Sequence, residues 1–162
     1  MTQSYHTTVF LIERLHRRFL DVIKAELDRL GIEDINNVQA LILFNIGKDE
    51  LTVGELTARG YYLGSNVSYN VKKMVETGYL AHQRSIHDRR SIRLSLTEKG
   101  LKLYAEMSQI FDQQIHMLGD AGIGDGDLRD TIESLEALEQ FWTKLVTLAS
   151  RGVVPAKAAS AA

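Results

Sequence analysis

Cysteine is absent from the 162 residues of this sequence. Its absence excludes disulfide bonds, zinc sites with thiolate ligands, cysteine nucleophiles and thiol-based redox sensing. Long hydrophobic runs are also missing, since no stretch reaches the roughly 18 apolar residues that cross a bilayer. The first residues, MTQSYHTTVFLIERLHRR, do not follow the order of a secretory signal peptide. We therefore expect a cytoplasmic protein with no membrane partner.

Motifs for catalysis, cofactors and metals are missing as well. The sequence contains no nucleophile elbow, phosphate-binding loop or dinucleotide fingerprint. Its five histidines lack paired ligand spacing, and the acidic, glycine-rich stretch 119–127 lacks the ligand order of a calcium-binding loop. We therefore expect neither catalytic residues nor a metal or cofactor site, and predict that the protein is not an enzyme.

Charge is divided unevenly along the chain. The whole sequence carries a formal net charge of -2, with 19 basic and 21 acidic side chains. Residues 59–102 hold nine basic and three acidic side chains, a local charge of +6, whereas 1–58 and 103–162 are both acidic. Such a local positive field can attract a polyanion to one face of a mildly acidic molecule.

Apolar residues recur at intervals of three and four along much of the chain, which predicts amphipathic helices. With 44% hydrophobic residues the chain can bury a core, as one domain or as one domain plus an extension. The first helix should run from about Tyr5 to Leu30. The second, over 38–46, is apolar on nearly every side and belongs in the core, with Asn36 or Asn37 as its N-cap.

A helix-turn-helix is predicted in the middle of the chain. Thr52 and Glu55 have the spacing of a capping box and begin a short helix that ends near Arg59. The next helix covers 65–77, and the connection between the two is short and contains glycine, as a helix-turn-helix requires.

A β-hairpin should follow, with strands over 79–86 and 91–96 and its tip at 87–90. The second strand alternates apolar and polar residues, which is typical of a strand with one buried face.

Two long helices are expected after the hairpin, the first capped by Thr97 and the second by Asp125 or Asp127. Their apolar positions repeat about every 3.5 residues, which favours a narrow seam of helix packing. The seam positions are Leu101, Tyr104, Ser108, Phe111, Ile115 and Leu118 in the first helix, and Leu128, Ile132, Leu135, Leu138, Trp142, Leu145 and Ala149 in the second. The tail over 151–162 is small and polar, and we expect it to be disordered.

The helix over 65–77 has two distinct faces. At 100° per residue, Val67, Val71, Met74 and Val75 form an apolar stripe, and the other face is polar at its start and basic further along. Such a face suits a recognition helix, with hydrogen-bonding side chains for base edges and lysines for phosphates. An ordinary exposed helix face explains this helix, taken alone, equally well.

The hairpin tip favours a nucleic-acid partner. Core packing explains Arg89 and Arg90 poorly, whereas guanidinium groups fit the negative minor groove of DNA and the phosphates beside it. Asp88 can hold one of these arginines in a fixed geometry or can satisfy backbone amides of the turn, and both roles can coexist.

Together these features resemble the MarR family of winged-helix transcription regulators. The resemblance covers about residues 5–150 and rests on the helix-turn-helix, the hairpin, the long helices at both ends, and two motifs. These motifs are Asp88-Arg89-Arg90 at the tip and Leu94-Ser95-Leu96-Thr97-Glu98-Lys99-Gly100 after it. Met74 and Val75 depart from the leucine and glutamate common in the family, which bears on sequence preference and not on the fold.

The resemblance implies a mainly α-helical fold with a small β-hairpin wing. It divides the chain into an N-terminal dimerisation helix (1–34), a winged helix-turn-helix DNA-binding domain (35–97), C-terminal dimerisation helices (98–150) and the tail. It further implies a homodimer on a pseudo-palindromic operator in double-stranded DNA, with 65–77 in the major groove and 87–90 in the minor groove. The implicated residues are Ser65, Asn66, Ser68, Tyr69, Lys72 and Lys73 on the helix, and Arg84, Asp88, Arg89 and Arg90 on the wing.

Family resemblance also implies a repressor that releases its operator when a small molecule binds, with an aromatic compound as one candidate effector. We place the effector pocket at His16, Phe19 and Gln39, for which interior packing is the alternative. Two recognition helices must sit about one DNA turn apart, so an effector that favours a wider spacing would weaken binding. The rival hypothesis is a winged helix that binds proteins and not DNA, and salt dependence of duplex binding separates the two.

Overall fold

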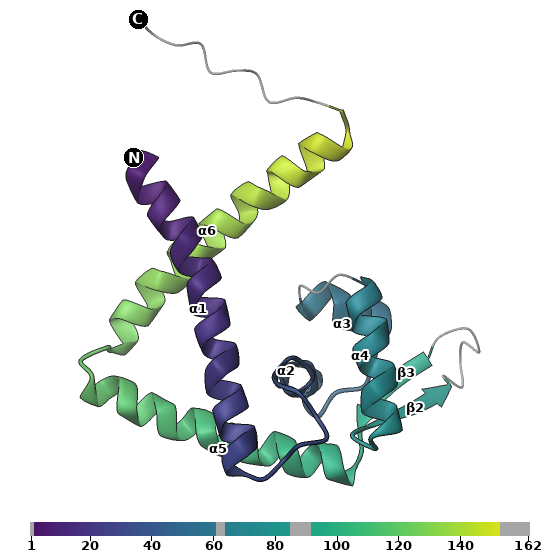
Figure 1. The fold of residues 1–162 in the computed structure, drawn as a ribbon. Helices are drawn as coiled ribbons and strands as arrows, with labels where there is room; N and C mark the ends of the chain where they lie inside the picture. Colours follow the sequence, from purple (N-terminus) through teal and green to yellow (C-terminus); the bar gives the residue numbers. More distant parts are fainter. Residues whose placement is uncertain (1, 61–63, 85–91, 153–162) are drawn as a thin grey trace, which may run out of the picture. The chain divides into compact units, whose positions relative to one another are not determined.

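The computed structural model describes residues 2–60, 64–84 and 92–152, and the chain forms two compact units that divide after Asp112. The elements, in chain order, are α1 (Thr2–Arg29), α2 (Asn37–Ile46), β1 (Leu51–Thr52), α3 (Val53–Gly60), α4 (Gly64–Glu76), β2 (Leu80–Arg84), β3 (Ile92–Leu96), α5 (Glu98–Asp120) and α6 (Asp125–Ser150). The expected fold class, mainly α-helical with a small β wing, is confirmed (Figure 1).

Side-chain caps begin several of these helices, much as the sequence predicts. Asn36 is the N-cap of α2, and its side chain accepts a hydrogen bond from the Gln39 amide at 2.9 Å. Thr52 and Glu55 form the predicted capping box before α3. The expected cap of α6 is corrected: its N-cap is Gly124, and the carboxylate of Asp127 accepts a hydrogen bond from the Gly124 amide at 2.9 Å. An acidic side chain is still satisfied at this helix start, where the helix dipole favours it.

The sheet has three antiparallel strands in the order β1-β3-β2, one strand more than the predicted hairpin. Leu51 pairs with Leu94 and Thr52 with Arg93, which adds β1 to the free edge of β3. A two-residue strand shows no alternation that sequence could reveal, because two residues are too few to define a period. β1 shortens the exposed edge of the wing and ties the start of α3 to it.

The core of the first unit is formed where α2, α3 and α4 meet the sheet (Figure 1), and buried residues of α1 and α5 complete it. α2 is buried on several sides, as its apolar sequence predicts, and Ile42, Leu43 and Ile46 are inaccessible to solvent or nearly so. Val67, Val71 and Met74 of α4 are buried against this core, which confirms the predicted stripe; Val75 is half-buried. Burying an aliphatic side chain contributes roughly 1.5–3 kcal/mol, so this stripe fixes which face of α4 points outward.

The most buried residues of α5 lie one position before those of the predicted seam. Leu103, Met107 and Ile110 are buried, whereas the seam residues Leu101 and Ile115 are 41% and 63% exposed. The seam positions and the positions one residue before them both repeat about every 3.5 residues. Only the packing of α5 against the core decides which of the two sets is more buried.

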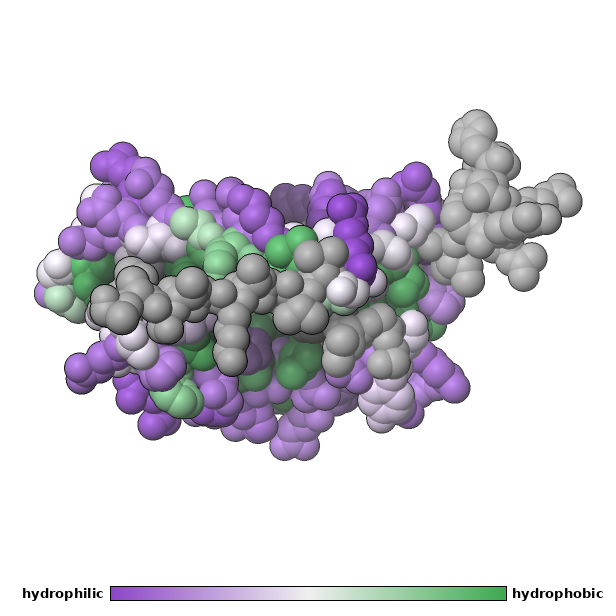
Figure 2. Space-filling model, turned by 90° about the horizontal axis from the view of Figure 1, so that it is seen from above, coloured by the Kyte–Doolittle hydropathy of each residue, from purple (hydrophilic) through white to green (hydrophobic). Residues whose placement is uncertain are grey.

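The terminal helices keep much of their apolar surface open. Only Ile23 and Leu27 of α1 are buried, and none of α6 is. Hydrophobic side chains therefore show between hydrophilic ones on the surface in Figure 2. Within the described ranges, no helix has the length and apolar content to span a membrane.

A tight contact joins α5 to the end of the helix-turn-helix. The Tyr79 backbone accepts a hydrogen bond from the Thr97 amide at 3.1 Å, and the Thr97 hydroxyl donates to the Gly78 carbonyl at 2.6 Å. A Cβ at Gly100 would lie 2.3 Å from the Tyr79 carbonyl oxygen. Only glycine fits there, which gives a physical reason for the glycine that ends the Leu94-to-Gly100 motif.

We predict that Gly100→Ala destabilises the fold by about 1–3 kcal/mol, because backbone must move to admit the methyl group. Gly119→Ala is the matched control in the same helix, since a Cβ there meets nothing within 4 Å. The control should be neutral or up to about 1 kcal/mol more stable. Urea unfolding measures both, and equal stability of the two variants would contradict the steric argument.

Candidate nucleic-acid interface

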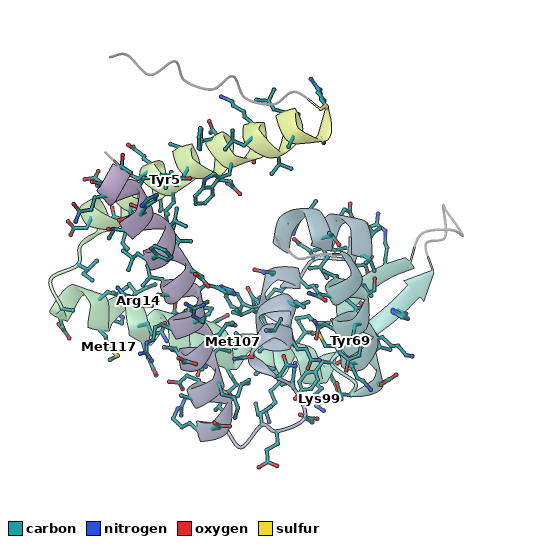
Figure 3. All side chains as sticks on the ribbon, turned by 45° about the horizontal axis from the view of Figure 1, so that its top comes forward. Tyr5, Arg14, Tyr69, Lys99, Met107 and Met117 are labelled. Atoms are coloured by element: carbon teal, nitrogen blue, oxygen red, sulfur yellow. The ribbon has the colours of Figure 1, made fainter. Side chains whose placement is uncertain are left out.

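The exposed face of α4 carries most of the predicted helix site. Asn66, Ser68, Tyr69, Lys72 and Lys73 are all exposed, and Tyr69 is 62% exposed despite its aromatic ring. Figure 3 labels Tyr69 on this helix. Because the stripe on the opposite face is buried, these side chains form one continuous polar surface. Ser65 is the second residue of α4, within the helix as predicted.

The two lysines share one carboxylate on α4. The Lys73 Nζ lies 2.9 Å from Glu76, and the Lys72 Nζ lies 4.0 Å from it. The hydrogen bond to Glu76 raises the pKa of Lys73, and the same bond lowers the pKa of Glu76. Both groups of the Lys73–Glu76 pair therefore stay charged at neutral pH. Such exposed pairs are weak, so a phosphate could replace Glu76 as the partner of either lysine.

The wing is described only in part. Arg84 is the last residue of β2 and pairs with Ile92 in the register. The tip residues Asp88, Arg89 and Arg90 lie outside the described residues. Arg93 was not among the predicted site residues; it is the second residue of β3, and its guanidinium donates to the Glu50 carbonyl at 3.3 Å. Arg93 thus links β3 to the segment before β1, and the contact could not be inferred from sequence because it spans 43 positions.

A polar cluster, named here the junction cluster, lies where α4 passes into the wing; it consists of Asp34, Tyr79 and Lys99. The Tyr79 hydroxyl donates to Asp34 at 2.7 Å, and the Lys99 ammonium bonds both Asp34 and the Thr77 carbonyl. The same ammonium lies 4.1 Å from the centroid of the Tyr79 ring, a cation–π contact. Figure 3 labels Lys99. The cluster holds together three parts of the chain: the segment before α2, the end of the helix-turn-helix and the first turn of α5.

The ionisation of the junction cluster follows from these contacts. The hydrogen bond from Lys99 and then that from Tyr79 lower the pKa of Asp34. Burial, together with the bond to Asp34, raises the pKa of Tyr79. At neutral pH the cluster is therefore an ion pair with a neutral phenol as a further donor.

Comparison with known proteins identifies the family. Residues 33–91 match the sequence model of the MarR family. A transcriptional activator of exopolysaccharide II synthesis, ExpG of Rhizobium meliloti (strain 1021), is 38% identical over 139 residues, which cover 86% of this chain and 72% of that protein. The chain belongs to the MarR family. It is thus a DNA-binding transcription regulator with a winged helix-turn-helix and not an enzyme.

Solved structures agree with this MarR-family fold. A MarR regulator from Methanosarcina mazei Go1 is 26% identical, with a TM-score of 0.69 over 86% of this chain and 99% of that one. FabT of Streptococcus pneumoniae, solved in complex with DNA, is 20% identical, with a TM-score of 0.70 over 87% of this chain and 99% of that one.

The three predicted effector residues of this MarR-family chain have different surroundings. His16 is exposed on α1, and Phe19, 39% exposed, stacks on Phe111 with ring centroids 6.0 Å apart. Gln39 is buried and lines a cavity near the end of α1 that neither His16 nor Phe19 lines. The effector pocket therefore stays a prediction, with Phe19 in an aromatic cluster that also includes Phe44.

The described part of the chain holds no group of three histidine, aspartate or glutamate side chains placed to bind a metal ion.

We predict that Asp34→Asn lowers the free energy of unfolding at neutral pH by no more than about 1 kcal/mol, because both partners are about half exposed. The folded-state pKa of Asp34 lies below its unfolded value, so the ionised group stabilises the fold above the unfolded pKa. That contribution is lost as the pH falls through the folded pKa. Urea unfolding at about pH 7 and about pH 3 should show the difference between wild type and variant shrinking in acid. A difference that stays constant with pH would contradict this assignment.

Proposed function

We propose that this protein is a homodimeric, sequence-specific regulator that reads a pseudo-palindromic operator with α4 in the major groove and the wing in the minor groove. The observation that carries the proposal is the division of α4 into a buried apolar stripe and a continuous polar and basic face. An α-helix fits the major groove of B-DNA, where base edges present distinct donors and acceptors.

Individual side chains on α4 suit different parts of the duplex. Asn66, Ser68 and Tyr69, with Ser65, can donate and accept hydrogen bonds with base edges. Lys72 and Lys73, further along, suit phosphates, which fix the position of a protein on DNA without reading sequence. FabT, solved with DNA, has the same fold, which supports this arrangement.

The wing completes the proposed interface. Arg89 and Arg90, with Asp88 beside them in sequence, follow β2, which ends at Arg84. Arginine is favoured in a narrow minor groove because the groove concentrates negative potential. Loss of both tip arginines should therefore weaken operator binding.

The homodimer is supported by apolar surface on the terminal helices. In α1, Phe10 and Leu15 are 69% and 55% exposed, and in α6, Ile132 and Val146 are 52% and 70% exposed. Helices whose apolar side chains are open to solvent commonly bury them against a second subunit. We propose that residues 1–34 and 98–150 form the dimer and that 35–97 form the DNA-binding domain.

A small-molecule effector is the remaining part of the proposal. Phe19 offers a partly open aromatic surface next to Phe111, which suits an aromatic ligand. Release of the operator would follow if the ligand favours a spacing of the two recognition helices that does not match one DNA turn. The direction of regulation depends on where the operator lies relative to the promoter. Repression stays a prediction, and ExpG carries the name of an activator.

The DNA-binding proposal predicts different effects for Tyr69→Ala and Lys72→Ala. The probes are a duplex selected from a random pool by the wild-type protein and a scrambled duplex of the same composition. Tyr69→Ala should weaken binding to the selected duplex by about 1–3 kcal/mol with little effect on the scrambled one. Lys72→Ala should weaken both and reduce the slope of log K against log salt by about 0.9.

Fluorescence anisotropy over a range of salt concentrations measures these affinities, and Lys24→Ala, an exposed lysine on α1, is the control for loss of charge. Lys24→Ala should bind like wild type. If the wild-type protein binds no duplex in a salt-dependent way, the rival hypothesis of a winged helix for protein contacts replaces this one.

The homodimer predicts that Ile132→Lys raises the dissociation constant of the dimer at least about tenfold, because a charge would enter an apolar interface. Glu133→Lys, at the next and already charged position of α6, should leave the dimer intact. Sedimentation equilibrium measures both. A wild-type protein that sediments as a monomer, or equal behaviour of the two variants, would contradict an interface on this face of α6.

A further inference from the structure

Apart from Tyr79 of the junction cluster, Gln39 is the one buried polar side chain among the described residues; it is 8% exposed and faces α4. Its Nε2 donates to the Oδ1 of Asn70 on α4 at 3.2 Å. Asn70 is half-buried, next to the exposed face of α4, and the site prediction did not include it. A buried amide needs partners, and here the partner is the proposed recognition helix.

Backbone bonds fix the orientation of both amides. The Oε1 of Gln39 accepts from the Asn36 amide at 3.1 Å, which leaves its NH2 group to face Asn70. The Nδ2 of Asn70 donates to the Asn66 carbonyl at 2.9 Å, which leaves its oxygen to face Gln39. Neither amide can flip without placing two acceptors or two donors against each other. The Gln39–Asn70 pair is therefore a directional link between α2 and α4.

The same region of α2 is also bound to α1. The Nδ2 of Asn37 donates to the Leu20 carbonyl at 3.0 Å.

Hydrophobic packing of α4 is nondirectional, so Val67, Val71 and Met74 alone tolerate small rotations or shifts of the helix. A hydrogen bond with fixed donor and acceptor restricts such movements, because it weakens steeply as its angle departs from linearity.

We infer that Gln39 is a positioning residue for DNA recognition: through Asn70 it sets the rotation and depth at which α4 presents Asn66, Ser68 and Tyr69 to base edges. The inference rests on the proposed function of α4, which it deepens by assigning part of the operator specificity to a buried residue. Base contacts are directional and lose strength when α4 is rotated, whereas lysine contacts with phosphates tolerate it. Loss of the link should thus reduce discrimination more than overall attraction to DNA.

Gln39→Glu tests the link with minimal disturbance. The new carboxylate still accepts a hydrogen bond from the Asn36 amide, as glutamate does at this position of a capping box, so α2 keeps its start. It cannot donate to Asn70, and two oxygens face each other. Asn70 cannot relieve this by flipping, because its oxygen would then face the Asn66 carbonyl.

Asn45→Asp is the matched control. It makes the same change from amide to acid in the same helix, at an exposed position. It therefore reports the effect of added negative charge alone. Thermal unfolding of both variants sets a temperature at which each is fully folded.

The measurement is the ratio of affinities for the selected and the scrambled duplex, together with the backbone ¹H–¹⁵N spectrum of the free protein. Gln39→Glu should reduce the ratio about tenfold or more, on the order of one lost base contact, while the salt slope on the scrambled duplex stays as in wild type. Amide signals of residues 66–73 should shift. Asn45→Asp should keep the wild-type ratio and α4 signals.

An unchanged ratio would overturn the positioning role, whether both affinities stay as in wild type or fall equally. Unshifted α4 signals in Gln39→Glu would overturn it too. If the wild-type protein discriminates no duplex, the proposed function fails separately. The spectrum of Gln39→Glu then tests the hydrogen-bonded link between α2 and α4 by itself. Shifts confined to α2 would refute the link, and shifts through α4 would support it.

Discussion

The close approach of α5 to the Tyr79 carbonyl is the constraint on which the winged helix depends. Gly100 leaves no Cβ between the two backbones, and the Thr97 hydroxyl bonds the Gly78 carbonyl in the same place. The first turn of α5 is thereby fixed to the point where α4 ends and β2 begins. Asp34, Tyr79 and Lys99 extend this fixed region to the segment before α2. The chain that leaves α4 is therefore held beside the first turn of α5.

Two kinds of force hold α4, and they have different consequences. Burial of its apolar stripe supplies most of the stabilisation, because area removed from water scales with apolar side chains and needs no fixed angle. The Gln39–Asn70 pair adds little free energy, about 0.5–1.5 kcal/mol for a typical hydrogen bond, but it adds direction. A helix that reads base edges needs both apolar burial and a directional hydrogen bond, because burial alone does not define the rotation of the helix.

The apolar surface of α1 and α6 and the basic face of α4 have different roles in the proposed function. We propose that exposed apolar side chains such as Phe10 and Ile132 lie in a dimer interface and that the exposed Lys72 and Lys73 bind DNA phosphates. A basic face can form in a chain of net charge -2 because the positive charge is concentrated in its middle third.

Sequence alone determined the helices, the capping box at Thr52 and Glu55, the buried stripe of α4 and the family, because each depends on local periodicity, local hydrogen bonds or a contiguous motif. It also indicated the exposed residues of α4, whose roles at DNA remain to be tested. Only the tertiary structure decided the pairing of β1 with β3, the buried face of α5, the contact of Arg93 with Glu50 and the partnership of Gln39 with Asn70. These depend on how distant segments meet, and a two-residue strand, an ambiguous 3.5-residue repeat or a lone glutamine carries no local signal of its partner.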